Sequence, residues 1–376
     1  MSDDALALWC RVREQVDWSS VTATPVSART ATRLHPRRGT PQAHQSSVAG
    51  PMLWPVDEPW PTCRLPHLVE IQRPMNDEEQ ALWRLADEQR AAAAARHANS
   101  PMSLRFAAAV REEAATAGAG PGARRMVHTW EPALPPQPVP LLPVLQLFAA
   151  DAPQIAFPRG TDLLQLLWCP FRHQEAPGQK VHYNGPAVHL LWRSAGELGT
   201  VATRSDPGPE GGYVLRPCVL HPEQITEYPD LEGLPEPLQS RVLQWEELND
   251  DDPFSDQEPL GYDYRNDLST APGLKVGGWP YWPHCPRPID CACGGELSLL
   301  LTMPNGERGA KSWTPLEEQH ASVRRADDHA FHDPTDFSGA RDALMVFVCT
   351  EDPYQQPYIN IEQLSPRSAE ARAVRR

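Results

Sequence analysis

Lysine is almost missing from this chain. Of the 34 basic residues only Lys180, Lys275 and Lys311 are lysines, and the remainder are arginines. This bias is typical of codon usage in a GC-rich genome, so we do not interpret the arginines as specialised chemistry. Positive charge is scarce as a whole, because 49 acidic residues give a formal net charge of −15. A nucleic-acid surface needs a net basic face, so we expect no nucleic-acid partner.

Long apolar runs are also missing. A helix that spans a bilayer needs about 20 apolar residues in succession, whereas the best runs here, Leu163 to Cys169 and Leu297 to Leu301, have the length of a strand. The first residues include Asp3 and Asp4 and lack the basic and apolar regions of a secretory signal. We therefore expect a cytoplasmic protein with no membrane partner.

Common catalytic motifs are absent as well. The sequence has neither a Gly-x-Ser-x-Gly elbow nor a His-Glu-x-x-His pair. Gly306 to Ser312 departs from a phosphate-binding loop, because Ala310 stands where glycine must precede Lys311. Gly118 to Gly122 follows an alanine-rich helical stretch rather than a strand, so we interpret it as a hinge and not as a dinucleotide-binding turn. We therefore assign no catalytic residue.

Proline, by contrast, is abundant. The chain holds 42 prolines in 376 residues, roughly twice the usual share. Proline interrupts helices and removes donors from a strand ladder, which argues against long helices and a doubly wound parallel sheet. Short strands are predicted at residues 143–148, 162–169, 187–193, 212–219, 296–303, 343–349 and 358–361. The predicted fold class is α+β with a β-rich body.

Helical periodicity marks four segments. These are Asp4 to Val16, Asn76 to His97, Leu104 to Thr116 and Glu236 to Leu248. Asn76 or Asp77 can cap the second segment, and acidic residues fill its first turn. This second segment and its continuation form a helical block that interrupts the strand pattern.

One motif occurs twice. Gly50-Pro-Met-Leu-Trp-Pro continues to Trp60-Pro-Thr-Cys63, and Gly277-Gly-Trp-Pro continues to Trp282-Pro-His-Cys285, so both end in Trp-Pro-x-Cys. In each case an apolar strand follows, then a strand that closes on cysteine, then a third strand. The matched order predicts two tandem duplicated units packed together as one pseudo-symmetric body, with a helical insertion in the first unit.

These patterns divide the chain into five parts. We predict an N-terminal helix and poorly ordered arm at 1–47, a first repeat unit at 48–248 with a helical insertion at 76–120, an acidic linker at 249–272, a second repeat unit at 273–365 with a cysteine cluster, and a C-terminal tail at 366–376.

The repeat motifs resemble the YwqG-like family of bacterial proteins of unknown function. The resemblance rests on Gly50–Cys63, Phe157–His173, Cys218–Glu223 with Glu227–Pro229, and Lys275–Pro280, and it covers roughly residues 48 to 363. The second copy is similar to the duplicated domain of the programmed cell death protein 2 family, whose members are implied to be chaperones of a ribosomal protein. Those relatives place Cys-x-x-Cys before the glycine, whereas this chain has Cys291-Ala-Cys293.

A cysteine cluster in the second unit predicts a metal site. Eight cysteines are too sparse for a disulfide framework in a chain of this length. Cys285, Cys291 and Cys293, with His284 beside them, offer up to four soft ligands within ten residues. Such donors suit tetrahedral zinc. The alternative is a loop with three reduced cysteines and no metal.

A second constellation pairs Cys63 with His67 and Cys169 with His173, each at the same spacing. If the two segments meet, they form a Cys2His2 set. The interpretation we prefer from sequence is that Cys169 closes a buried strand and that both histidines are exposed.

The tryptophans of the repeat motifs suggest a binding surface. Trp54, Trp60, Trp279 and Trp282 alternate with prolines and can form stiff amphipathic ridges that suit an extended peptide. The sequence therefore favours a non-enzymatic protein-binding module, chaperone-like or immunity-like, which holds a peptide or partner protein between the repeat units. The alternatives are a metal-dependent enzyme that uses the Cys/His sets and a scaffold protein.

Overall fold

The structure is a computed structural model, and it describes residues 28–96, 126–179, 183–198, 200–204, 213–249, 263–282, 289–307, 313, 333–340 and 343–361. The chain divides into two compact units. We call residues 1–66 with 134–376 the body and residues 67–133 the arm. Both predicted repeat units thus contribute to one body. No helix in the described part of the chain has the length and apolar content needed to cross a membrane.

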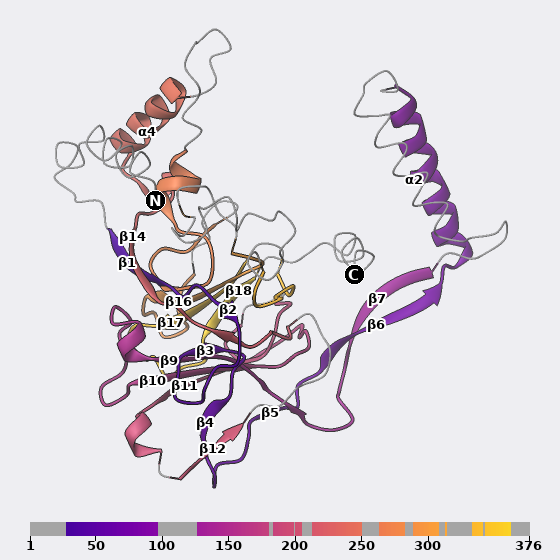
Figure 1. Ribbon diagram of the computed structural model, residues 1–376. Coiled ribbons are helices and arrows are strands. Elements are labelled where there is room, and N and C mark those ends of the chain that lie inside the picture. The colour runs from indigo at the N-terminus through magenta and orange to yellow at the C-terminus, as the bar shows by residue number, and fades with distance from the viewer. Residues whose placement is uncertain are drawn as a thin grey trace. The chain divides into compact units, whose positions relative to one another are not determined.

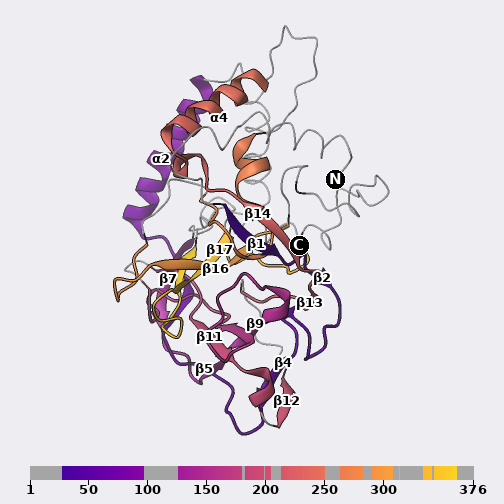
Figure 2. The ribbon, with the colours of Figure 1, turned by 90° about the vertical axis from the view of Figure 1, so that its left-hand side faces the viewer.

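The first sheet of the body, sheet A, has six antiparallel strands (Figure 1). Their order is β14-β1-β15-β16-β17-β18. The bounds are β14 Glu223–Glu227, β1 Arg29–Arg33, β15 Lys275–Gly277, β16 Leu297–Pro304, β17 Ala343–Cys349 and β18 Tyr358–Ile361. Figure 2 shows β1 running beside β14. Sheet A therefore combines one strand from the beginning of the chain with five from its second half.

The second sheet of the body, sheet B, also has six antiparallel strands. Their order is β2-β13-β3-β9-β10-β11. The bounds are β2 Arg37–Arg38, β13 Cys218–Val219, β3 Ser47–Val48, β9 Leu142–Phe148, β10 Leu163–Trp168 and β11 Val188–Arg193. Sheet B takes five strands from residues 37–193 and one, β13, from later in the chain.

The two sheets have the same internal arrangement. In each, a meander of three strands (β9-β10-β11 or β16-β17-β18) continues from a short strand (β3 or β15). Both meanders carry a bulge at the same place, because the register shifts between Leu166 and Leu167 in one and between Leu299 and Leu301 in the other. A positive φ follows Val48 and Val276 alike, at Ala49 and Gly277.

The correspondence extends to the strands that come from the opposite half. β1 is followed by Leu34-His35-Pro36 and then β2, while β13 is followed by Leu220-His221-Pro222 and then β14. The two segments meet, since the backbone N–H of His221 donates to the carbonyl of Leu34 at 2.8 Å. Each Leu-His-Pro segment thus carries the chain from one sheet to the other.

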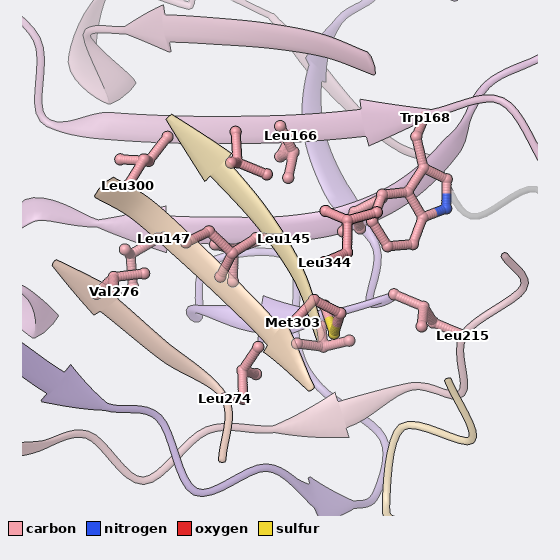
Figure 3. Close-up of a cluster of buried hydrophobic side chains, with 14 of the residues drawn as sticks. Leu145, Leu147, Leu166, Trp168, Leu215, Leu274, Val276, Leu300, Met303 and Leu344 are labelled. Carbon is pink, nitrogen blue, oxygen red and sulfur yellow. The ribbon is translucent and has the colours of Figure 1, made fainter. Parts of the chain in front are cut away.

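The hydrophobic core lies between the sheets. Leu145, Leu147, Leu166 and Trp168 of sheet B and Val276, Leu300, Met303 and Leu344 of sheet A are labelled members of one buried cluster (Figure 3). The strands that supply them are continuous apolar runs, as expected where both faces are covered. Two buried polar side chains of sheet B bond to each other, because the Gln165 amide nitrogen donates to Gln146 Oε1 at 3.0 Å, and the same nitrogen donates to the Leu53 carbonyl of β4 (Met52–Pro55) at 2.7 Å.

Shorter elements complete the body. The short ladders pair β4 (Met52–Pro55) with β12 (Val201–Arg204) and β5 (Thr62–Cys63) with β8 (Val139–Pro140). Short 3-10 turns lie at Ala149–Asp151, Ala195–Glu197 and Leu231–Gly233. The predicted helix near residue 236 is confirmed as α4 (Glu236–Asn249).

Two domain predictions were wrong. Residues 29–47 were assigned to a poorly ordered N-terminal arm, yet they contain β1, β2 and the first residue of β3. β1 is ordered because it hydrogen-bonds to strands on both sides. The acidic linker was assigned to 249–272, yet Tyr264–Ser269 form a π-helix, η4, whose Tyr264 ring is buried against the cluster around Leu238. The predicted helices at 4–16 and 104–116 lie outside the described residues.

The arm contains a hairpin and a helix. β6 (His67–Pro74) pairs with β7 (Met126–Ala133), and α2 spans Asp77–Arg96. Asn76 caps α2 as predicted, since its Oδ1 accepts from the Glu79 N–H at 2.8 Å. The Glu79 carboxylate accepts from the Asn76 N–H at 2.8 Å, which completes a capping box.

Candidate metal centres

Four Cys and His side chains converge in the structure, and we call them centre 1. Cys63 ends β5, Cys169 directly follows β10, and His173 forms a bridge with Gly185. His67 follows Cys63 by four residues. The ligand atoms of these four side chains all lie within 4.8 Å of one another, and all four residues are buried. The Cys2His2 set that sequence left as the alternative is therefore assembled.

The orientation of His173 fits metal coordination. Its Nδ1 lies 2.9 Å from the Pro66 carbonyl oxygen, which can only accept, so Nδ1 carries the proton. The unprotonated Nε2 then faces Cys63 Sγ at 3.8 Å. Histidine ligands of zinc usually donate their other ring N–H to a carbonyl or carboxylate in this way, which fixes the tautomer.

The ionisation of the thiols in centre 1 depends on whether a cation is bound. The hydrogen bond with Cys63 and burial of the thiol raise the pKa of Cys169 well above its ordinary value. Without a counter-charge, two buried thiols next to each other resist ionisation. A divalent ion reverses this balance, because a coordinating thiol is deprotonated outright. Two thiolates and two imidazoles are a ligand set that zinc takes tetrahedrally, so the residues present fit this metal.

Apolar side chains enclose centre 1. Cys63 and Cys169 belong to a small buried cluster with Met52, Trp54 and Leu167. With four protein ligands and this shell, a tetrahedral ion has no position left for a substrate or water. Such closed sites are structural rather than catalytic.

Our preferred sequence interpretation of these histidines was wrong. His67 and His173 were expected to be exposed, yet their relative accessibilities are 5% and 0%. The equal Cys-x-x-x-His spacing of the two segments was the signal for their convergence. Sequence alone could not show that the two Cys-x-x-x-His segments meet, because they are about a hundred residues apart. The pairing of β5 with β8 and of β9 with β10 brings them together.

A second group of thiols lies in the second half of the body. Cys291 and Cys293 are joined there by Cys349, the last residue of β17, and the three sulfur atoms lie within 4.8 Å of one another. Cys349 was not among the predicted ligands. Cys285 and His284, which were, lie outside the described residues.

Hydrogen bonds concentrate on the exposed thiol of this group. Cys291 and the Gly295 backbone N–H lie 3.2 and 3.3 Å from Cys293 Sγ. These hydrogen bonds, with one from Cys349, lower the pKa of Cys293 to about 7. At neutral pH a substantial fraction of this thiol is therefore the thiolate, which is the form that binds metals.

The four tryptophans that we predicted to bind a partner make contacts with other residues of the body. Trp54 is buried, and its indole N–H donates to the Glu58 carbonyl, so it does not present a surface to a partner. Trp60 is half-buried and donates to the Leu141 carbonyl. The Arg29 guanidinium covers the Trp279 ring, and Trp282 stacks on Phe347.

The Lys275–Pro280 motif has a structural explanation that sequence did not supply. Lys275 and Glu227 form an ion pair whose side chains are both fully buried. Glu227 also accepts from the backbone N–H groups of Ala271 and Trp279, so its carboxylate is well satisfied. A Cβ on Gly278 would lie 2.2 Å from Glu227 Oε2, which explains the glycine at this position. Burial lowers the pKa of Lys275.

Comparison with known proteins places this chain in no family. No family model matches it, and a search of curated proteins finds no match. The resemblance to the YwqG-like family therefore stays a prediction.

Proposed function

We propose that the chain is a protein-binding module rather than an enzyme, and that a structural metal ion, zinc by the donor set, stabilises its fold at centre 1. The burial of all four candidate ligands of centre 1 supports a structural rather than a catalytic role for this ion, and the exposed apolar side chains of the arm support the binding function. A catalytic zinc site keeps an open position, and this arrangement leaves none.

We infer that the body arose by tandem duplication with strand exchange. Matching strand orders, bulges and Leu-His-Pro segments support this inference. The first strand of each half, β1 or β13, has moved into the sheet of the other half. Such an exchange makes the halves interdependent, which suits a rigid support for a binding element.

The binding element that we propose is the arm. Core side chains from both sheets fill the space between them, so we do not place the partner there. Large exposed apolar side chains are instead concentrated in the arm: Val69 40%, Ile71 38%, Leu82 61%, Leu85 52%, Met126 43% and Trp130 44%. Among the described residues, β6 and β7 form a sheet of two strands, which is marginal in water by itself.

The ligand that we propose for the arm is an extended segment of a partner protein. Val69 and Ile71 are two residues apart in β6 and so lie on one face of the hairpin. An added strand with apolar side chains at alternate positions would pair with the backbone at an edge of the hairpin and place those side chains on the same face as Val69 and Ile71. Chaperone-like and immunity-like roles both fit such a mode of binding.

Site-specific photo-crosslinking in the native host tests this proposal. We expect a crosslinker at Thr129, which is opposite Ile71 in the hairpin, to capture a defined partner segment. A synthetic peptide of that segment should bind the purified chain, and Ile71→Asp should weaken binding by roughly tenfold or more.

The matched control is Val56→Asp, which changes an exposed valine of the body (52%) and should leave peptide affinity unchanged. Equal affinity of the Ile71→Asp and wild-type chains for the captured peptide would refute the arm as the binding element. Crosslinks that arise from body positions and never from Thr129 would do the same.

A further inference from the structure

The thiols Cys291, Cys293 and Cys349 have no part in the function proposed above. Cys293 Sγ lies 3.2 Å from Cys291 Sγ and 3.3 Å from Cys349 Sγ. Cys349 is buried, Cys291 is half-buried and Cys293 is exposed. The sulfur atoms therefore converge at a place that solvent reaches from one side, unlike those of centre 1.

This cluster corresponds to centre 1 in the other half of the body. β10 and β17 are the middle strands of their meanders, and Cys169 and Cys349 stand at the same ends of these strands. Each cysteine lies two residues beyond the bulge, after Leu167 or Phe347. Since Cys169 belongs to centre 1, the fold places Cys349 where the other half has a metal ligand.

The loop beside Cys349 is shaped around the sulfur atoms. Gly294 has a φ of +84°, which favours glycine. A Cβ on Gly295 would lie 2.8 Å from Glu351 Cγ, 3.1 Å from Cys349 Sγ and 3.2 Å from Cys293 Sγ, so a larger residue would crowd the sulfur atoms. The Gly295 N–H donates to Cys293 Sγ at 3.3 Å. The Gly295 N–H and the three cysteine side chains thus converge on the same small region.

We propose that Cys291, Cys293 and Cys349 form a second metal site, which binds one thiophilic divalent ion such as Zn²⁺ or Cd²⁺. Thiolates select soft ions over Mg²⁺ and Ca²⁺. Binding forms three metal–sulfur bonds, replaces the S–H bonds of those thiols that are still protonated and releases their protons to solvent, and no electron is transferred. The chain then holds one ion in each cluster.

Cadmium titration of the full-length chain tests this site. We expect two Cd²⁺ per chain under reducing conditions, read by metal analysis after gel filtration and by the ultraviolet thiolate-to-cadmium band. Cys293→Ser should bind one Cd²⁺, and its band should lose the contribution of this cluster. Cys218→Ser is the matched control and should still bind two, because Cys218 belongs to neither cluster.

A second measurement covers the case in which Cys293→Ser perturbs the loop. In the wild-type chain, Cd²⁺ should protect Cys291 and Cys293 from iodoacetamide, as read by peptide mass spectrometry. One Cd²⁺ per chain in both wild type and Cys293→Ser would overturn the proposal. So would alkylation of Cys293 at the same rate with and without Cd²⁺.

Discussion

Cys63 and Cys169 show how burial changes the chemistry of a single residue. In water each thiol would be an ordinary weak acid. In the body they lie next to each other and next to two buried imidazoles. Proximity and burial raise the pKa of Cys169 and so favour the neutral thiol, whereas a bound divalent ion would compensate both thiolates at once.

Removal of one ligand should therefore cost both metal and stability. We expect Cys169→Ser to lose one zinc per chain and to lower the free energy of unfolding by about 2 kcal/mol or more, since structural zinc contributes directly to folding. Metal analysis of the purified chain and thermal unfolding measure the two effects.

The control for this change is Cys218→Ser. Cys218 is also buried, and its thiol donates to the Pro334 carbonyl at 3.3 Å, which a serine hydroxyl can replace. This variant should keep its zinc. If Cys169→Ser retains full zinc and unfolds at the wild-type temperature, centre 1 holds no metal.

At the scale of elements, the beginning of α2 depends on two residues. Asn76 and Glu79 each accept a hydrogen bond from the backbone N–H of the other, and Arg73 pairs with the Glu79 carboxylate. The hydrogen bond with Arg73 lowers the pKa of Glu79 to about 2. The carboxylate therefore remains ionised at neutral pH, and its negative charge interacts favourably with the positive end of the helix dipole.

Loss of the cap should loosen this helix locally. We expect Asn76→Ala to destabilise α2 by about 1 kcal/mol, because one helix N–H loses its acceptor. Amide hydrogen exchange in residues 77–86 should become roughly fivefold faster. Asn76→Asp preserves an acceptor and should leave exchange near the wild-type rate; equal exchange in the alanine variant would mean that the cap does not limit helix opening.

At the scale of the whole body, each sheet contains one strand from the other part of the chain. β1 lies between β14 and β15 in sheet A, and β13 lies between β2 and β3 in sheet B. Removal of either strand would expose the ladder hydrogen bonds of two neighbours and open the shared core at Leu34 or Leu220. Neither half contains a complete sheet of its own.

Chain fragments should therefore fold only together. We expect fragments 1–208 and 209–376 to form a complex with one cooperative transition when they are co-expressed, and to be unfolded or insoluble when expressed alone. Gel filtration and circular dichroism check this result. A first fragment that begins at residue 39 lacks β1 and β2 and should not assemble; a stable, cooperatively folded fragment 209–376 by itself would contradict the exchange.

The sequence by itself determined the local features of this protein. Apolar runs bounded by proline and glycine predicted β9, β10, β16 and β17 within about two residues, and the Asn76 cap marked the beginning of α2. These features depend on neighbours in the chain, because propensity, capping and burial periodicity act over a few residues.

Only the tertiary structure decided how distant segments combine. Residues 29–38 look polar and irregular in sequence, yet two neighbouring strands satisfy the backbone of β1. The same holds for centre 1, where Cys63 and Cys169 are separated by the whole arm. Strand partners and metal ligands are set by contacts between remote residues, and these leave little trace in the local sequence because their stabilisation arises only when the sheets close around one core.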